Sequence, residues 1–204
     1  MADTFLDKAY NTVGTEETRA LYADWAKSYD KEISENGYAT PGRCADALKS
    51  VTRDFTKPIL DFGCGTGLSG LALSLAGFKT IDGVDLTQEM LDRAKEKQLY
   101  RSLRLSEPDK GFTINSGEYA AVAAIGVIGA GAAQIDVFDL IINALPSEAH
   151  FVFSFNDHTL KDPRFEANVN AAIAANKAKI LVENYGDHLR GLNMKSKVYV
   201  LEKT

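Results

Sequence analysis

The sequence predicts an α/β fold with a doubly wound, mostly parallel sheet covered by helices on both faces. From residue 58 onward, short apolar segments alternate with amphipathic ones, which is the pattern of strands and helices in a parallel sheet. A chain of 204 residues with 45% hydrophobic residues has the length and composition that one globular core can organise. We therefore expect a single domain over residues 1–204, with a helical lead-in at 1–55 and the main core at 56–204.

The lead-in is expected to contain two helices. Leu21, Trp25 and Tyr29 recur at helical spacing, which predicts one helix over residues 16–33. Thr40-Pro41 offers an N-cap followed by proline at the first helical position, which predicts a second helix up to residue 51. Because the first helix is rich in aromatic residues, we expect it to act as a lid over the core.

The core elements are expected to follow in alternation. The expected strands are residues 58–62, 79–84, 100–105, 119–125, 150–155, 179–183 and 197–201. Four helices are expected between these strands. The first follows residue 67 and places Leu68, Leu71 and Leu75 on the sheet, and the second is capped by Thr87 and carries Met90, Leu91 and Ala94. The third spans residues 135–144, and the fourth begins at Asp162-Pro163. No helix separates the last two strands, so they should pair antiparallel at one edge of the sheet.

Composition and charge narrow the functional classes. Lys and Arg number 23 against 28 Asp and Glu, a net charge of −5 that is opposite to the footprint of a phosphate-backbone binder, so no nucleic-acid partner is expected. The longest apolar stretch, residues 120–133, is shorter than the roughly 20 residues of a membrane span. The first ten residues lack the apolar core of a secretory signal, which predicts a cytoplasmic protein. Cys44 and Cys64 lie outside any metal-binding spacing, so we expect them reduced and expect no metal.

A strand that runs into three alternate glycines is the strongest functional signal. The segment reads Asp61-Phe-Gly63-Cys-Gly65-Thr-Gly67 and precedes an expected helix. Glycines permit positive φ and leave no Cβ in the way of a ligand, and the N-terminus of the helix offers free N–H groups. The pattern predicts a loop whose backbone approaches a polar ligand.

Two classes of ligand fit this loop. Residues 65–70 also satisfy GxGxxG, and Asp85 follows about 20 residues later, as in dinucleotide-binding folds. Asp61 directly before the glycines, the helical lead-in and the final antiparallel pair favour a nucleoside ligand without phosphates. A nicotinamide-dependent oxidoreductase is the alternative.

These features resemble the class I S-adenosylmethionine-dependent methyltransferases. Residues 61–67 resemble their first motif and residues 83–91 their second, while residues 22–30 resemble the N-terminal segment of small-molecule enzymes in the Williams–Beuren-region methyltransferase-like branch. The resemblance implies a Rossmann-like, doubly wound, seven-stranded sheet, with S-adenosylmethionine as cofactor. It also implies methyl transfer, with a non-catalytic protein that binds the cofactor or S-adenosylhomocysteine as a further alternative.

The same resemblance assigns roles to individual residues. Asp61 would face the methionine end of the cofactor, above a floor made by Gly63, Gly65 and Gly67. Asp85 would hold the ribose and Leu86 would touch adenine. Residues 124–128 resemble the fourth motif, which would place Gly126 beside the methionine moiety, and Tyr29 would cover the cofactor.

The methyl acceptor is expected to be a small molecule bound by the variable segments of the chain. Tyr38, Asn156 and His158 are the substrate candidates. His158 follows the fifth strand, where open α/β sheets place ligand-facing loops, and is a weak candidate for a general base. The competing interpretation of His158 is a polar turn residue that bonds locally. Asp82, near the ribose candidate, should have almost no effect on ligand binding if its side chain faces solvent.

Overall fold

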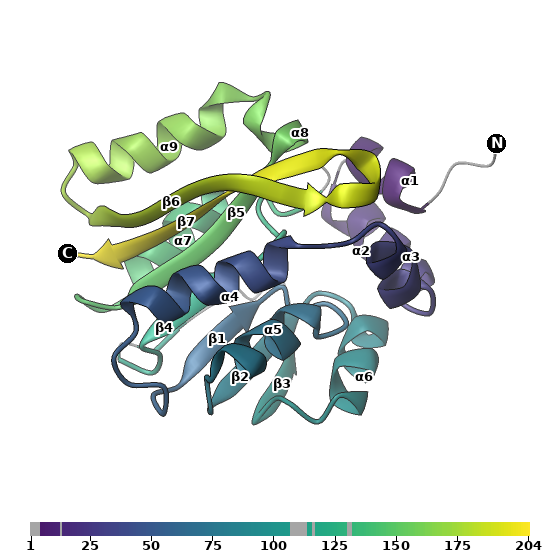
Figure 1. Cartoon of the computed structure of the whole chain (residues 1–204), viewed down its shortest axis with the longest axis horizontal. Helices are drawn as coiled ribbons and strands as arrows, with labels where there is room; N and C mark the ends of the chain where they lie inside the picture. The colour runs from purple at the N-terminus through teal and green to yellow at the C-terminus, as the bar shows by residue number, and fades with distance from the viewer. Residues whose placement is uncertain (1–4, 13, 107–113, 116, 130–131) are drawn as a thin grey trace.

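One twisted sheet organises the chain (Figure 1). The computed structural model describes residues 5–12, 14–106, 114–115, 117–129 and 132–204. In these residues the strands are β1 (Ile59–Phe62), β2 (Ile81–Asp85), β3 (Ser102–Leu105), β4 (Ala121–Ala124), β5 (His150–Asn156), β6 (Ala178–Leu189) and β7 (Met194–Lys203). Their order is β3-β2-β1-β4-β5-β7-β6, and the first five are parallel while β7 runs antiparallel to both β5 and β6. The predicted seven-stranded sheet with an antiparallel pair at one edge is confirmed.

Helices cover both faces of this sheet. They are α1 (Phe5–Asn11), α2 (Thr15–Trp25), α3 (Tyr29–Glu35), α4 (Thr40–Val51), α5 (Leu68–Ala76), α6 (Gln88–Glu96), α7 (Asp136–Ala144), α8 (Asp157–Leu160) and α9 (Pro163–Ala174). Figure 1 shows α4, α5 and α6 in front of the sheet and α7 behind it. Strand β5 serves both cores, because Phe151 and Phe153 pack on the α7 and α9 side while Val152 packs on the α4 and α5 side.

The predicted helix over residues 16–33 is two helices, which corrects the sequence interpretation. Helix α2 ends at Trp25 and α3 begins at Tyr29, with a turn in which Ser28 N donates to Trp25 O at 2.9 Å. The bend brings Trp25 Nε1 within 2.9 Å of Glu32 Oε2. In a continuous helix these two residues would stand about 10.5 Å apart along the axis. The turn therefore buries the indole ring while its N–H keeps a partner.

The face of α5 that meets the sheet was also predicted wrongly. Leu71 and Leu75 are 38% and 79% exposed, whereas Leu73 is fully buried. The helix turns a face of small residues inward, and a Cβ at Gly70 would collide with the hydroxyl of Tyr100. The inward face of α5 therefore consists of Ser69, Gly70 and Leu73, and Gly70 permits the close approach of Tyr100.

The edge hairpin is longer than predicted. Strands β6 and β7 extend over residues 178–189 and 194–203, and a 3-10 turn at Arg190–Leu192 joins them. Strand β6 is the sheet edge and carries Ile180, which is 38% exposed.

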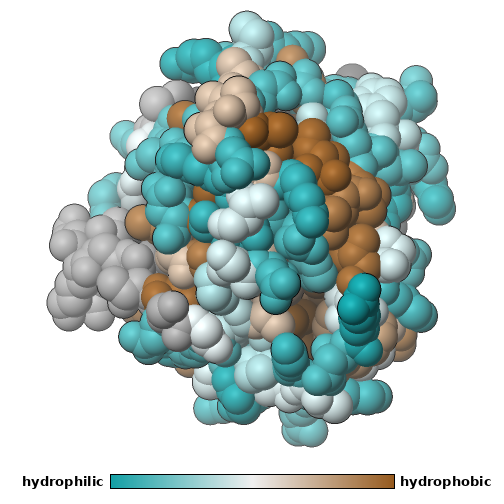
Figure 2. Space-filling view, turned by 90° about the vertical axis from the view of Figure 1, so that its left-hand side faces the viewer, coloured by the Kyte–Doolittle hydropathy of each residue, from teal (hydrophilic) through white to brown (hydrophobic). Residues whose placement is uncertain are grey.

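Figure 2 shows a patch of apolar side chains on the end of the molecule that lies at the left of Figure 1. Within the described residues, no helix has the length and apolar character that crossing a membrane requires.

Candidate functional site

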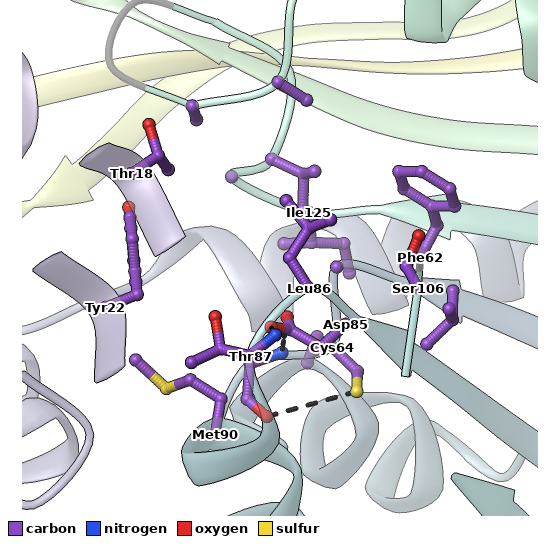
Figure 3. A pocket seen from close by; sticks show the side chains of 18 of the residues that line it. Thr18, Tyr22, Phe62, Cys64, Asp85, Leu86, Thr87, Met90, Ser106 and Ile125 are labelled. Atoms are coloured by element: carbon purple, nitrogen blue, oxygen red, sulfur yellow. Dashed lines mark hydrogen bonds between the residues drawn. The ribbon is translucent and has the colours of Figure 1, made fainter. Parts of the chain in front are cut away.

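A cavity of about 470 Å³ opens at the carboxyl ends of β1, β2 and β4, under the N-terminal helices. This is the edge of a parallel sheet where ligands of open α/β folds bind. In Figure 3, Thr18 and Tyr22 of α2 face Leu86 and Ile125 across the cavity, and Met90 of α6 lies below them. The lining is mostly apolar, with a small set of polar groups that converge from the glycine loop and the end of β2.

The glycine loop between β1 and α5 has the backbone that the sequence predicts. Gly63, Gly65 and Gly67 have φ of +69°, +52° and +91°. A Cβ at Gly63 would lie 2.5 Å from Val127 Cγ2, so this glycine is needed for packing. A Cβ at Gly65 would meet no described atom within 4 Å, and Gly65 lines the cavity. The loop therefore leaves open space where a ligand could lie against the backbone.

Asp85 ends β2 at the cavity wall, as expected. Its Oδ2 accepts from Gly65 N at 2.8 Å, and its Oδ1 accepts from Thr87 N at 2.9 Å. Burial raises the pKa of Asp85, while these backbone N–H bonds oppose the rise. Each carboxylate oxygen has a second lone pair, so Asp85 can also accept from the hydroxyl groups of a ligand. Burial, together with the charge of Asp85, raises the pKa of Tyr22 across the cavity to about 12.

Asp61 is not among the residues that line the cavity, although the sequence predicts that it faces the ligand. Its side chain is fully buried, and Oδ2 accepts from Ser69 Oγ at 2.6 Å and Tyr100 Oη at 2.7 Å. Its Oδ1 has no hydrogen-bond partner among the described residues. Burial raises the pKa of Asp61 to about 6, although the bonds from Ser69 and Tyr100 lower it. The carboxylate thus holds α5 and Tyr100 beneath the glycine loop.

The other candidate residues divide into two groups. Tyr29, Tyr38, Leu86 and Gly126 line the cavity, as do Gly63, Gly65 and Asp85. The lining does not include Gly67, Asn156 or His158. Asn156 lines a smaller neighbouring chamber, where its Oδ1 accepts from Thr159 N at 3.0 Å and so caps α8. His158 lies within α8, and burial lowers its pKa.

The side chain of Asp82 does not face solvent, so the condition for its use as a silent control is not met. This residue is 2% exposed and binds Arg101, Ser102 and Tyr119, with the Ser102 and Tyr119 hydroxyls at 2.8 and 2.9 Å. Burial would raise the pKa of Asp82, but these three partners lower it overall. Asp82 therefore holds β2 to β3 and Tyr119.

A family comparison covers the segment that builds this cavity. Residues 59–127 match the family model described as a methyltransferase domain. The matched segment runs from β1 to the residue after Gly126 and includes the glycine loop and Asp85. This segment is therefore similar to methyltransferase domains, in line with the resemblance that the sequence shows. Two solved methyltransferases share the fold, one in complex with S-adenosylhomocysteine (TM-score 0.56, 11% identity) and one with bound S-adenosylmethionine (TM-score 0.57, 13% identity).

Two curated relatives align with about half of the chain. The chain is 33% identical to methyltransferase-like protein 27 of Homo sapiens over 117 residues, 54% of this chain and 46% of that protein. It is 30% identical to the 18S rRNA (guanine-N(7))-methyltransferase of Bos taurus over 107 residues, 52% of this chain and 36% of that protein. The chain thus spans less than half the length of these two relatives. A TehB-like methyltransferase from Corynebacterium glutamicum shares the fold, with a TM-score of 0.61 and 20% identity over 91% of this chain and 99% of that one.

Three residues that line the cavity were not among those expected to contact a ligand. They are Thr18, Tyr22 and Met90. A signal was present for two of them, because the expected helix over residues 16–33 would place Thr18 and Tyr22 on the same face as Tyr29, the residue expected to cover the cofactor. The neighbouring Trp25 is buried, whereas Tyr22 lines the cavity.

The cavity fits the family's cofactor in three respects. The open space at Gly65 lets a ligand lie against the glycine loop, and Asp85 can accept hydrogen bonds from a ribose diol. The apolar side chains of Leu86 and Met90 can pack against an adenine ring. In the part of the chain that is described, no group of three or more His, Cys, Asp or Glu side chains could hold a metal ion.

Proposed function

We propose that this chain transfers the methyl group of S-adenosylmethionine to a small-molecule acceptor. One observation carries the proposal. A ligand-sized space lies against the backbone of Gly65, and beside it lies the carboxylate of Asp85, which accepts hydrogen bonds from two backbone N–H groups. The match of residues 59–127 to a methyltransferase domain supports the same activity.

In this proposal the chain binds and orients the two reactants. The cofactor supplies a methyl group on a sulfonium, so transfer breaks the methyl–sulfur bond with its electron pair left on sulfur and forms a bond to the acceptor. Asp85 would hold the ribose, Leu86 and Met90 would flank the adenine, and Gly126 would border the methionine moiety. Alignment of acceptor and methyl in an apolar, water-poor site can supply much of the rate enhancement.

The N-terminal helices would close this site. Tyr22 of α2 and Tyr29 of α3 line the cavity, while Trp25 between them is buried against Leu6 and Ile33 in a small core of its own. This division supports a lid whose buried face folds independently of the ligand and whose tyrosines contact it.

The nature of the acceptor separates this proposal from the function of some relatives. The 18S rRNA methyltransferases act on RNA, whereas this chain has a net charge of −5. Binding of an RNA backbone depends on neutralising phosphates with Lys and Arg. The charge therefore favours a small molecule, which binds in the enclosed space beside the cofactor.

Calorimetry and an acceptor screen test the proposal. The chain is titrated with S-adenosylhomocysteine and with NAD, and methyl transfer from isotope-labelled S-adenosylmethionine is measured with small-molecule fractions and with rRNA. Binding of S-adenosylhomocysteine without NAD binding, and label in small molecules, supports the proposal. Binding of NAD alone overturns the cofactor, label in rRNA overturns the acceptor class, and cofactor binding without any transfer points to a binding protein.

A further inference from the structure

A second chamber of about 50 Å³ adjoins the cofactor cavity, and its wall includes one nitrogen each of His188 and Asn156 that bonds to no described residue. The two spaces share Tyr22, Tyr29, Tyr38, Gly126 and Ala132 as lining residues. The hydroxyl of Tyr38 stands at their boundary, since a Cβ on Gly126 would lie 2.5 Å from it. The chamber is thus on the side of the cavity where the proposed function needs an acceptor.

A chain of hydrogen bonds fixes the protonation of His188 at the chamber wall. Arg43 Nη1 donates to Ser196 Oγ at 2.9 Å, and Ser196 Oγ lies 2.8 Å from Thr40 Oγ1. Thr40 Oγ1 in turn lies 2.8 Å from His188 Nδ1. A guanidinium can only donate, so Ser196 Oγ accepts from Arg43. Thr40 is the only other side-chain partner of Ser196 Oγ among the described residues, so the buried Ser196 proton has an acceptor only when it is donated to Thr40. The proton of Thr40 is then directed to His188 Nδ1.

This direction determines what His188 presents to the chamber. With Nδ1 accepting, the neutral ring carries its proton on Nε2, the nitrogen on the far side from Thr40. Burial, the dominant cause, lowers the pKa of His188 to about 4, so the ring is neutral at pH 7. The charges of Asp157 and Arg43 act on this pKa in opposite directions. His188 is therefore an N–H donor rather than a base.

Asn156, at the end of β5, adds a second donor. Its Oδ1 accepts from both Thr159 N and Thr159 Oγ1, at 3.0 and 3.1 Å, which fixes the orientation of the amide. No described residue accepts from the amide nitrogen, and Asn156 lines the same chamber as His188. The rest of the lining includes the apolar side chains of Leu6, Ala9, Trp25, Ile33 and Leu189.

We propose that this chamber is the acceptor subsite and that His188 Nε2 and Asn156 Nδ2 bind a carbonyl or carboxylate oxygen of the methyl acceptor. The inference rests on the proposed function, because it assigns the methyl acceptor to the space beside the cofactor. Two N–H donors in an apolar chamber select an oxygen with free lone pairs and disfavour an ammonium group, which would need acceptors. The polar end of the acceptor is therefore an sp² oxygen, with an apolar body toward Trp25 and Tyr22.

Nuclear magnetic resonance of the full chain tests the donor assignment without any cofactor. Long-range proton–nitrogen spectra distinguish the two nitrogens of a neutral histidine, and the expected result at pH 7 is a proton on Nε2 of His188. Thr40→Val, which removes the hydroxyl and keeps the shape, should shift His188 toward a mixture of tautomers while His150 stays unchanged. A proton on Nδ1 of His188 in the unaltered chain overturns the inference.

Ligand binding in the presence of S-adenosylhomocysteine tests the selectivity. Benzoate and benzamide present a charged and a neutral sp² oxygen, and benzylamine presents a cation of similar size. We expect benzoate or benzamide to bind and to perturb His188, benzylamine to bind at least fivefold more weakly, and His188→Leu to weaken the oxygen ligands about two- to tenfold. His188→Gln, which keeps an N–H near the position of Nε2, should retain most of the affinity.

The outcomes separate this inference from the proposed function. Equal or tighter binding of benzylamine, or no loss in His188→Leu, overturns the acceptor subsite while S-adenosylhomocysteine still binds. Failure of S-adenosylhomocysteine to bind the unaltered chain overturns the proposed function, and with it the role of the chamber in methyl transfer.

Discussion

The carboxylate of Asp30 in α3 lies 2.7 Å from the ammonium group of Lys97, the residue that follows α6. Lys97 Nζ also donates to Thr66 O at 2.6 Å, and the Thr66 hydroxyl donates to Asp30. Three segments that are distant in sequence, the N-terminal helices, the glycine loop and the end of α6, are thus joined at one point. This point fastens the helical cover beside the cavity.

Removal of the Asp30–Lys97 ion pair should speed the release of a ligand from the cavity. Side-chain exposures of 44% for Asp30 and 21% for Lys97 limit the pair to about 1 kcal/mol or less. We expect Asp30→Asn and Lys97→Met each to raise the Kd for S-adenosylhomocysteine about two- to fivefold, with faster amide exchange over residues 15–35. Equal effects in the single and double variants would show that the pair acts as a unit. The exposed Lys31–Glu35 pair serves as control, and an equal loss in Lys31→Met would contradict the special role of Asp30.

The open space at Gly65 yields a paired test of cofactor placement. Gly65→Ala should lose roughly 1–2 kcal/mol of stability, because alanine at φ +52° is strained, and its methyl group should then block the cavity. Gly117→Ala is the control, since Gly117 has φ +78° and also no described atom within 4 Å of its Cβ position. Calorimetry should find S-adenosylhomocysteine binding reduced at least tenfold in Gly65→Ala alone. Unchanged binding in Gly65→Ala would mean that the ligand does not lie on this loop.

Asp85 should contribute strongly to cofactor affinity. Asp85→Asn keeps one acceptor oxygen for the backbone but loses the charge-assisted bonds to a ribose, so we expect the Kd for S-adenosylhomocysteine to rise about 10- to 150-fold, or roughly 1.5–3 kcal/mol. Asp92→Asn, on the exposed face of α6, should match the unaltered chain. Asp82 cannot serve as this control, because Arg101 and Tyr119 bind it in the core. Equal affinities of the Asp85 and Asp92 variants would place the ribose elsewhere.

Asp61 and His188 should give the unliganded protein opposing pH dependences. Asp61 has its pKa raised from 3.8 to about 6, so its contribution is complete below pH 3.8 and is lost as the pH rises through 6. His188 has its pKa lowered from 6.5 to about 4, so its contribution is complete above pH 6.5 and is lost as the pH falls through 4. Each change amounts to about 3 kcal/mol, and the two largely cancel between pH 4 and 7.

Urea unfolding at several pH values separates these two terms. Asp61→Asn should show stability that increases from pH 4 to 7 relative to the unaltered chain, and His188→Gln should show the reverse. Parallel profiles for all three proteins would contradict the assigned burial of these groups.

The cavity could be predicted from the sequence where its residues are close in sequence. The alternate glycines and Asp85 follow two strands of one parallel sheet, so local pattern and topology place them together. The direction of Asp61 could not be predicted in this way, because it depends on Tyr100, which reaches the carboxylate from a segment 39 residues away.

The acceptor side was less predictable for the same reason. His188 owes its protonation to Thr40, 148 residues earlier, and no local motif marks either residue. Tyr22 and Trp25 both lie in α2, yet Trp25 is buried and bonded to Glu32 across the break to α3, while Tyr22 lines the cavity. Secondary structure was predictable by periodicity, whereas the rotation of each helix depended on its tertiary neighbours.

The position of β7 has a consequence for how the protein folds while it is being synthesised. This strand follows both β5 and β6 in sequence yet lies between them in the sheet. Until it emerges from the ribosome, β5 is an unpaired edge beside Phe151, Phe153 and Phe155, and an unpaired apolar edge is a site of aggregation. Truncation before residue 194 should therefore leave a chain that recruits chaperones or aggregates, even though every residue of the glycine loop is already present.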